Sequence, residues 1–184
     1  MPQTVTRIFT FDSGHRVMNE CFKCFNLHGH TYKIEATWQF DTIESIGYAV
    51  DFKEIKRLFG QFVDDYLDHG FIANPHDSTY IKACIEEKSK LWVMSLNQGN
   101  YCNPTAENIA KEIFLIADSL VHDYKVGLRC QNIRLWETPN CYVDCDVTSI
   151  TRDEKHNFFK ENETKLSDYK KLKGKRNYDD RKKD

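Results

Sequence analysis

A short segment near the N-terminus concentrates residue types that bind metals. The stretch CFKCFNLHGHTY, residues 21–32, holds two cysteines and two histidines. His28 and His30 are two positions apart, so on a β-strand both imidazoles project to the same side. His15 ends the preceding alternating stretch and supplies a third imidazole if the two strands pair as a hairpin. Three neutral imidazoles around an open position are typical of a catalytic zinc site.

Cys21 and Cys24 leave a second interpretation open. Their C-x2-C spacing, together with His28 and His30, would make a closed, structural zinc site. However, Cys24 precedes His28 by only four residues, a shorter loop than such sites use, and the same loop must return His15 to the cluster. We therefore favour one cysteine as a nucleophile or base beside the metal, where a nearby cation promotes ionisation of the thiol.

Two other positions carry groups suited to proton transfer or ligand binding. Asp68 and His69 are adjacent, and a carboxylate that holds an imidazole in one tautomer is a common acid–base pairing. Glu137 shares its strand face with Ile133 and Leu135, so its carboxylate is either paired inside the core or receives a ligand. An acceptor-only group at that position suits the N–H edge of a planar, amidine-like ring.

The periodicity of apolar residues predicts the elements that position these groups. Alternation predicts strands over 5–15, 28–40, 131–138 and 141–150, the last two joined at a Pro-Asn turn. Helical stripes follow Asp51, a plausible N-cap, and Thr105, which is placed to cap a helix that runs to 121. A weaker helical pattern covers 78–92. This order predicts an α+β fold with an antiparallel sheet and helices packed on one face.

Composition and charge predict one soluble domain with a charged tail. We expect a domain over 1–151, with an inserted segment at about 77–100, and a tail over 152–184 that is a solvated helix or disordered. The net charge of −2 gives no reason to expect nucleic-acid or membrane binding. Seven cysteines is an odd number, and the first residues lack the apolar core of a secretion signal, so we expect a cytoplasmic protein without a disulfide scaffold.

Six short motifs occur in an order that resembles the 6-pyruvoyl-tetrahydropterin synthase superfamily, over about 6–150. They are FDSGHR, CFNLHGHTY, VDFKEIK, LDHGFIANPHD, NPTAENIA and WETPN. The C-x3-H-G-H spacing from Cys24 resembles the 6-carboxy-tetrahydropterin synthase group within that superfamily. The resemblance implies the tunnelling fold (T-fold), in which subunits assemble into a barrel, commonly a homohexamer formed from two trimers.

The resemblance also implies a role for each candidate residue. Zn²⁺ would be bound by His15, His28 and His30, and protons would be handled by Cys24, Asp68 and His69. Glu137 would anchor the amino-pyrimidine edge of a pterin, with help from Thr105. Lys23 and Arg16 are candidate contacts for a triphosphate, although solvated cations are an equally good interpretation of both.

The implied reaction converts 7,8-dihydroneopterin triphosphate to 6-carboxy-5,6,7,8-tetrahydropterin, with release of acetaldehyde and triphosphate, in 7-deazaguanine biosynthesis of the queuosine or archaeosine type. One alternative is the 6-pyruvoyl-tetrahydropterin synthase reaction, which eliminates triphosphate but keeps the carbon chain. Another is a non-catalytic zinc-binding module, in which Cys21, Cys24 and two histidines close the site. That module would leave Asp68, His69 and Glu137 without a role.

Overall fold

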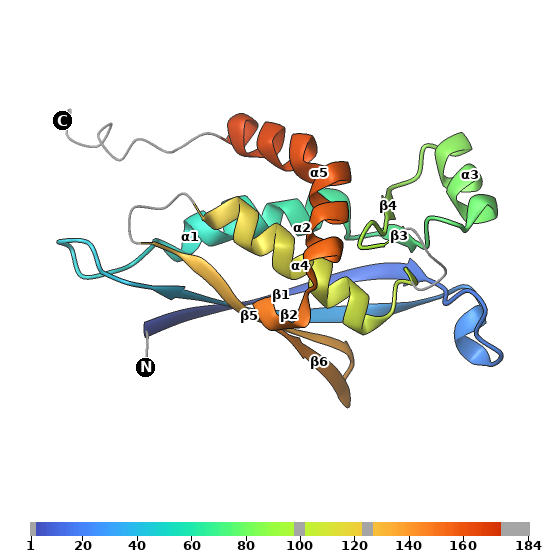
Figure 1. Ribbon diagram of the computed structural model, residues 1–184, viewed down its shortest axis with the longest axis horizontal. Helices are drawn as coiled ribbons and strands as arrows, with labels where there is room; N and C mark the ends of the chain where they lie inside the picture. Colours follow the sequence, from blue (N-terminus) through green and yellow to red (C-terminus); the bar gives the residue numbers. More distant parts are fainter. Residues whose placement is uncertain (1–2, 98–101, 123–126, 174–184) are drawn as a thin grey trace.

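One twisted sheet of six strands organises the chain in the computed structural model, which describes residues 3–97, 102–122 and 127–173. The strand order is β4-β3-β1-β2-β5-β6, and the helices lie on one face of the sheet (Figure 1). The strands are β1 (Gln3–His15), β2 (His28–Phe40), β3 (Gly70–Ala73), β4 (Leu91–Val93), β5 (Arg129–Thr138) and β6 (Cys141–Cys145). The prediction of an α+β sheet with helices on one face is confirmed.

The central hairpin of β1 and β2 pairs along its whole length in antiparallel register, with Phe11 opposite Tyr32 and His15 opposite His28. Side chains of alternate residues are buried under the helices, as the period-two pattern predicts. The rings of Phe11 and Tyr32 stack with centroids 4.9 Å apart, next to the histidine end of the hairpin. This regular pairing fixes which residues of the two strands share a face.

The antiparallel prediction is wrong for one edge of the sheet, where β3 pairs parallel to β1 and β4 pairs parallel to β3. These strands are only four and three residues long, too short to show a period, and the helical segment that precedes β3 allows the crossover that a parallel pair requires. The pairing matters for function because it sets Gly70 opposite Ser13. Asp68 and His69 therefore lie beside β1.

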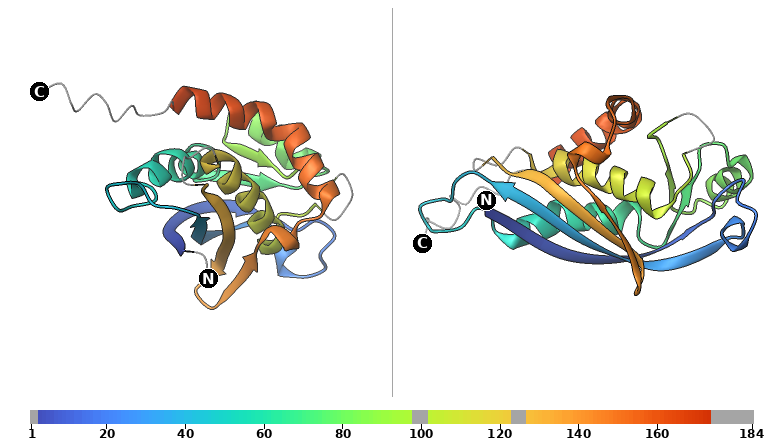
Figure 2. Two further views of the ribbon diagram at one scale, coloured as in Figure 1. Left: turned by 60° about the vertical axis from the view of Figure 1, so that its left-hand side comes forward. Right: turned by 60° about the horizontal axis from the view of Figure 1, so that its bottom comes forward.

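The helices form a layer over the sheet (Figures 1 and 2). A helical segment runs through α1 (Phe52–Ile55), a π-helical turn (Lys56–Gly60) and α2 (Gln61–Tyr66), and α4 covers Ala106–Val121. Asp51 and Thr105 accept backbone N–H groups of these helices, so both predicted N-caps are confirmed. The weaker helix prediction is right for α3 (Ser78–Glu86) but wrong for residues 91 and 92, which belong to β4.

The C-terminal segment forms a long helix, α5 (Arg152–Lys173), across the helical layer (Figure 2). A helix was one of the two expected states, but the expectation that it is solvated is wrong for one face, which buries Phe158, Asn162, Leu166 and Tyr169. Residues 174–184, and residues 98–100 of the expected insertion, lie outside the described part of the chain. Among the described helices, none has the length and apolar character that crossing a membrane requires.

Candidate active site

Three histidines meet at the open end of the β1–β2 hairpin. His15 faces His28 across the hairpin, and His30 is opposite Ser13 one step further along the same face. The ring centroids are 4.5 Å apart for His15 and His28, 5.2 Å for His15 and His30, and 5.0 Å for His28 and His30. The prediction that strand pairing brings His15 to the H-G-H motif is confirmed.

Backbone carbonyls orient two of these imidazoles. Nδ1 of His15 lies 2.6 Å from the carbonyl oxygen of Pro104, and Nδ1 of His28 lies 2.7 Å from that of Asn26. A carbonyl only accepts, so each Nδ1 carries the proton and each Nε2 keeps its lone pair. Nε2 of His15 is buried and finds no hydrogen-bond partner among the described residues. Burial lowers the pKa of His15 to about 4 despite the opposing bond to Pro104, and the two other histidines lower it further.

This arrangement fits a metal ion. One ligand nitrogen from each of His15, His28 and His30 lies within 4.8 Å of the others, and the imidazole that is most buried is neutral at physiological pH. Three imidazoles form the donor set of an open zinc site. Neither Cys21 nor Cys24 belongs to this group. Both thiols are exposed, and Cys24 lies in a 3₁₀ turn (Lys23–Phe25), so the arrangement does not support a closed site with cysteine ligands.

Glu137, near the end of β5, is the acidic residue that faces the histidines. Its Oε1 atom lies 3.8 Å from Nε2 of His15 and 3.9 Å from Nε2 of His30. The hydroxyl of the buried Tyr32 is 3.4 Å from Nδ1 of His15. Burial and the neighbouring Glu137 carboxylate raise the pKa of Tyr32 well above its usual value. A carboxylate therefore lies directly against the candidate metal ligands.

Asp68 and His69 form a second pair, joined by a 2.6 Å contact between Oδ2 of Asp68 and Nδ1 of His69. The backbone of Asp12 holds both residues, since its N–H donates to Asp68 and its carbonyl accepts the N–H of His69. Burial raises the pKa of Asp68, but hydrogen bonds from Asp12 and His69, together with the charge of Lys90, outweigh it and hold that pKa below its usual value. The predicted acid–base pairing is thus present in the structure.

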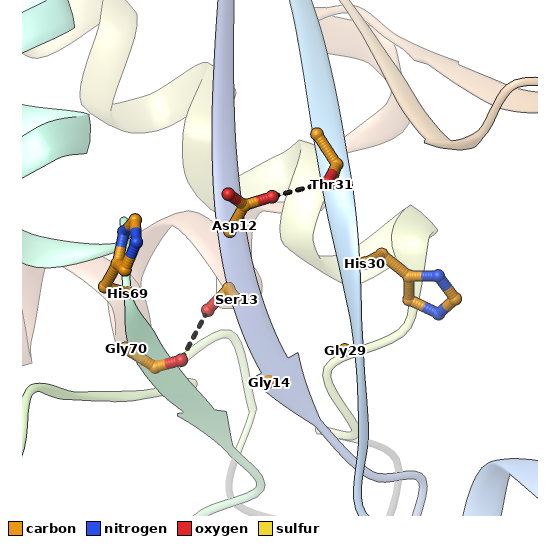
Figure 3. Close-up of a pocket in the computed structure, with 8 residues that line it drawn as sticks. All are labelled: Asp12, Ser13, Gly14, Gly29, His30, Thr31, His69 and Gly70. Carbon is orange, nitrogen blue, oxygen red and sulfur yellow. Dashed lines mark hydrogen bonds between the residues drawn. The ribbon is translucent and has the colours of Figure 1, made fainter.

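His69 adopts φ 55°, in the left-handed region that few residues other than glycine occupy. Its side chain is exposed and helps to line a pocket of about 400 Å³ above the two facing glycines Gly14 and Gly29 (Figure 3). In that view His69 and His30 lie on opposite sides of the β1–β2 pair. Within one chain, no hydrogen bond or ion pair of the described residues joins Cys24 or the Asp68–His69 pair to the histidine group.

Residue types alone do not indicate the roles of Asp77, Asn103 and Pro104 near the site. Arg16 is held by two hydrogen bonds, of 2.6 and 2.8 Å, to the buried carboxylate of Asp77, so it is not a solvated cation. The side chain of Asn103 bonds both the N–H and the carbonyl of Met18. This contact ties the segment that carries Pro104 to the loop after His15. Thr105 accepts the N–H of Asn108, and its hydroxyl thus caps α4.

The match to a known family covers most of the chain. The family model described as 6-pyruvoyl tetrahydropterin synthase matches residues 4–147. The chain belongs to the 6-pyruvoyl tetrahydropterin synthase family. Every candidate site residue, from His15 to Glu137, lies within the matched range.

Relatives of this family are similar in sequence and in fold. A 6-carboxy-5,6,7,8-tetrahydropterin synthase of Rickettsia bellii is 39% identical over 143 residues, which are 76% of this chain and 96% of that protein. A protein of the same name from Haemophilus influenzae is 32% identical, with the same coverage. The structure of Caenorhabditis elegans 6-pyruvoyl tetrahydropterin synthase superposes with a TM-score of 0.55 at 20% identity, covering 79% of this chain and 96% of that one. The chain therefore has the fold of these synthases, and the relatives group it with enzymes.

Proposed function

We propose that the chain converts 7,8-dihydroneopterin triphosphate and water to 6-carboxy-5,6,7,8-tetrahydropterin, acetaldehyde and triphosphate. The observation that carries the proposal is the open three-histidine group, two of whose members belong to the C-x3-H-G-H motif. The relatives named 6-carboxy-5,6,7,8-tetrahydropterin synthase support the same reaction. In this proposal His15, His28 and His30 bind Zn²⁺. The bound ion would polarise the side-chain hydroxyls of the substrate and lower their pKa.

The chain's own residues supply binding and proton transfer in this proposal. The carboxylate of Glu137 accepts N–H groups from the amino-pyrimidine edge of the pterin, with Thr105 at the start of α4 as a further contact. The Cys24 thiolate removes a proton from the substrate side chain, and His69, oriented by Asp68, returns one. The 2.6 Å contact between Asp68 and His69 supports the second of these roles.

The separation of these groups within one chain supports the oligomeric part of the proposal. Cys24 lies on an exposed loop, His69 has an exposed side chain, and neither belongs to the three-histidine group of its own chain. A homohexamer with sites between subunits would bring groups from different copies together, and unpaired sheet edges are available for such contacts. The proposal places the reaction in the cytoplasm, in 7-deazaguanine biosynthesis, with a small-molecule substrate and no nucleic-acid partner.

Product analysis tests the reaction. Zinc-loaded protein is incubated with 7,8-dihydroneopterin triphosphate, and acetaldehyde and the pterins are followed by mass spectrometry, with a Cys24→Ala variant alongside. We expect acetaldehyde and the 6-carboxy product, both lost in the variant. A 6-pyruvoyl product without acetaldehyde would instead assign the related synthase reaction, since the same zinc and thiol serve both. Absence of any turnover by folded, zinc-loaded protein would contradict both reactions.

A further inference from the structure

The half-buried carboxylate of Glu137 interacts with the phenol of Tyr32 and also faces the ring nitrogens of two histidines. Its Oε1 atom lies 3.8 and 3.9 Å from Nε2 of His15 and of His30, too far for a hydrogen bond. Nε2 of His15 is an acceptor, because the proton of that ring lies on Nδ1. A carboxylate oxygen also only accepts. Two acceptors therefore face each other, at a place where His15 has no other partner for this nitrogen among the described residues.

No side chain of the described residues supplies the missing positive charge. The ion-pair distances of Glu137 involve His15 and His30 only, and no described lysine or arginine pairs with it. Buried or half-buried carboxylates are normally compensated by a cation or by several donors. A cation held between Oε1 and the two histidines would satisfy the carboxylate and the lone pair of His15 at once, with His30 as a further ligand.

The distances agree with that explanation. Two atoms bound to one tetrahedral zinc ion, each at its usual bond length, lie about 3.4 Å apart. The observed separations of 3.8 and 3.9 Å exceed this value by a few tenths of an ångström. Glu137 lies outside the group whose ligand atoms are all within 4.8 Å of one another, so ligation requires its carboxylate to move towards that group. The fully buried Tyr32 interacts with the Glu137 carboxylate through its hydroxyl, which holds the carboxylate on the side of the histidines.

We propose that Glu137 is a displaceable fourth ligand of the metal ion. In the substrate-free enzyme Oε1 completes the coordination begun by the three histidines. When a 2-amino-4-oxo-pyrimidine ring binds, its N–H donors draw the carboxylate off the metal and so free a coordination position for the hydroxyls of the same molecule. The inference rests on the proposed function, in which Glu137 is the anchor for the pterin ring. It makes ring recognition and metal activation one event.

Cobalt(II) in place of zinc provides the test, because its visible spectrum reports the identity and number of ligands. The metal-free protein, a Glu137→Gln variant and a Glu107→Gln control are each loaded with Co²⁺. Glu107 is exposed in the first turn of α4, so the control makes the same chemical change away from the ligand nitrogens. We expect Glu137→Gln alone to change the spectrum and to weaken Co²⁺ binding by at least about tenfold.

The second arm adds 7,8-dihydropterin, which has the ring edge but no side-chain hydroxyls to bind the metal. We expect it to shift the wild-type cobalt spectrum towards that of Glu137→Gln and to leave the variant unchanged. Identical spectra and affinities for wild type and Glu137→Gln would overturn the proposal. So would a wild-type spectrum that stays constant while calorimetry shows that dihydropterin binds.

These readouts separate this inference from the proposed reaction. Loss of turnover in Glu137→Gln is expected from the anchoring role alone, so turnover is not used as a test of metal ligation. Turnover by wild type, together with a cobalt spectrum that does not change in Glu137→Gln, would support the proposed reaction and contradict metal ligation by Glu137. The expected spectra without turnover by wild type would support metal ligation by Glu137 and contradict the proposed reaction.

Discussion

The histidine centre and a second buried polar centre around Glu112 differ in whether their hydrogen bonds are complete. In the histidine centre, the buried His15 presents a nitrogen without a partner towards Glu137. In the other centre, the buried Glu112 of α4 accepts the indole N–H of Trp92 at 2.6 Å and the backbone N–H of Ser95 at 2.6 Å. The hydroxyl of Ser95 is also within 3.1 Å of Glu112 and accepts in turn from Asn162 of α5.

The difference separates a binding site from a structural junction. The Glu112 centre joins three parts of the fold, namely α4, α5, and β4 with the segment that follows it. Protein donors occupy both carboxylate oxygens of Glu112. A satisfied polar network holds elements together and has no capacity left for a ligand. The histidine centre, at the open end of the β1–β2 hairpin, retains an acceptor without a donor, Nε2 of His15, as a metal site requires. Substitutions in the two centres should therefore affect different properties.

The largest effect is expected at the histidine centre. His28→Ala should lower turnover of the proposed substrate by about three orders of magnitude, because it removes a ligand of the ion that stabilises developing charge. His28 is half-exposed, so the fold should survive. Steady-state rates, with circular dichroism as the folding check, measure this. His122→Ala changes an exposed histidine at the C-terminal end of α4 and is the control. Equal losses of turnover in the two variants would contradict a specific role for the histidine centre.

The two cysteines of the exposed loop should also differ. Cys24→Ser should lower turnover by about 10²–10⁴-fold, the range for loss of a positioned general base, whereas Cys21→Ser should keep turnover near the wild-type level. Rates of both variants at matched zinc content measure the contrast. The opposite ranking would assign the base to Cys21.

The position of Cys24 and His69 outside the histidine group of their own chain allows a complementation test. Inactive Cys24→Ala and His69→Ala chains, mixed under conditions that exchange subunits, should regain part of the activity if one site takes these residues from different copies. Each variant alone, put through the same exchange, is the control. Mixed oligomers, verified by mass spectrometry, that stay inactive would show that both residues must come from one chain.

A smaller effect, on stability and not on zinc binding, is expected at Glu112. Burial raises its pKa from 4.5 to about 7, against the bonds from Ser95 and Trp92. The folded chain thus binds this proton more tightly than the unfolded chain. The stabilising contribution is complete below pH 4.5 and is lost as the pH rises towards 7. The advantage of wild type over Glu112→Gln should therefore shrink by about 2 kcal/mol between pH 5 and pH 7.5.

Urea unfolding of the metal-free wild type and Glu112→Gln at both pH values measures this difference. The contribution of His15, whose lowered pKa makes stability rise with pH over the acid range, is common to both proteins and cancels in the comparison. An advantage that grows with pH would mean that the carboxylate is held ionised, and that its donors outweigh burial.

The smallest effect is expected at Thr105, which caps α4 beside the site. Thr105→Ala should lower the free energy of unfolding by about 1 kcal/mol, the usual cost of a lost N-cap. Thr105→Ser, which keeps the hydroxyl, should restore both stability and substrate binding. A KM of Thr105→Ala equal to that of the wild type would remove Thr105 from the substrate contacts.

The sequence predicted the histidine centre better than the Glu112 centre for a physical reason. Period-two alternation over 13 residues in each strand set the register of β1 and β2, and the register placed His15 opposite His28. Glu112 is one charged residue in a helix whose charges normally face solvent. Its partner Trp92 lies in a three-residue strand, and the sequence pattern assigns Trp92 to a helix instead. Short strands carry no period, so only tertiary pairing reveals them.

The packing of α5 was hidden by composition. Its buried residues Phe158, Asn162, Leu166 and Tyr169 recur at helical spacing, but one is polar and dense charges surround them all. Average hydropathy therefore indicates a solvated segment although one narrow stripe is buried. Similarly, the carbonyl of Pro104, which orients His15, leaves no signal in residue type, because any residue has a carbonyl to offer.

Zinc stoichiometry of the purified chain tests the central distinction most directly. Metal-free wild type, His15→Ala and Glu112→Gln are titrated with Zn²⁺ in competition with a chromophoric chelator. We predict one tightly bound ion per chain for wild type and for Glu112→Gln, and none for His15→Ala. Tight binding that survives His15→Ala, or that is lost in folded Glu112→Gln, would contradict the assignment of the unsatisfied centre to the metal and the satisfied one to the fold.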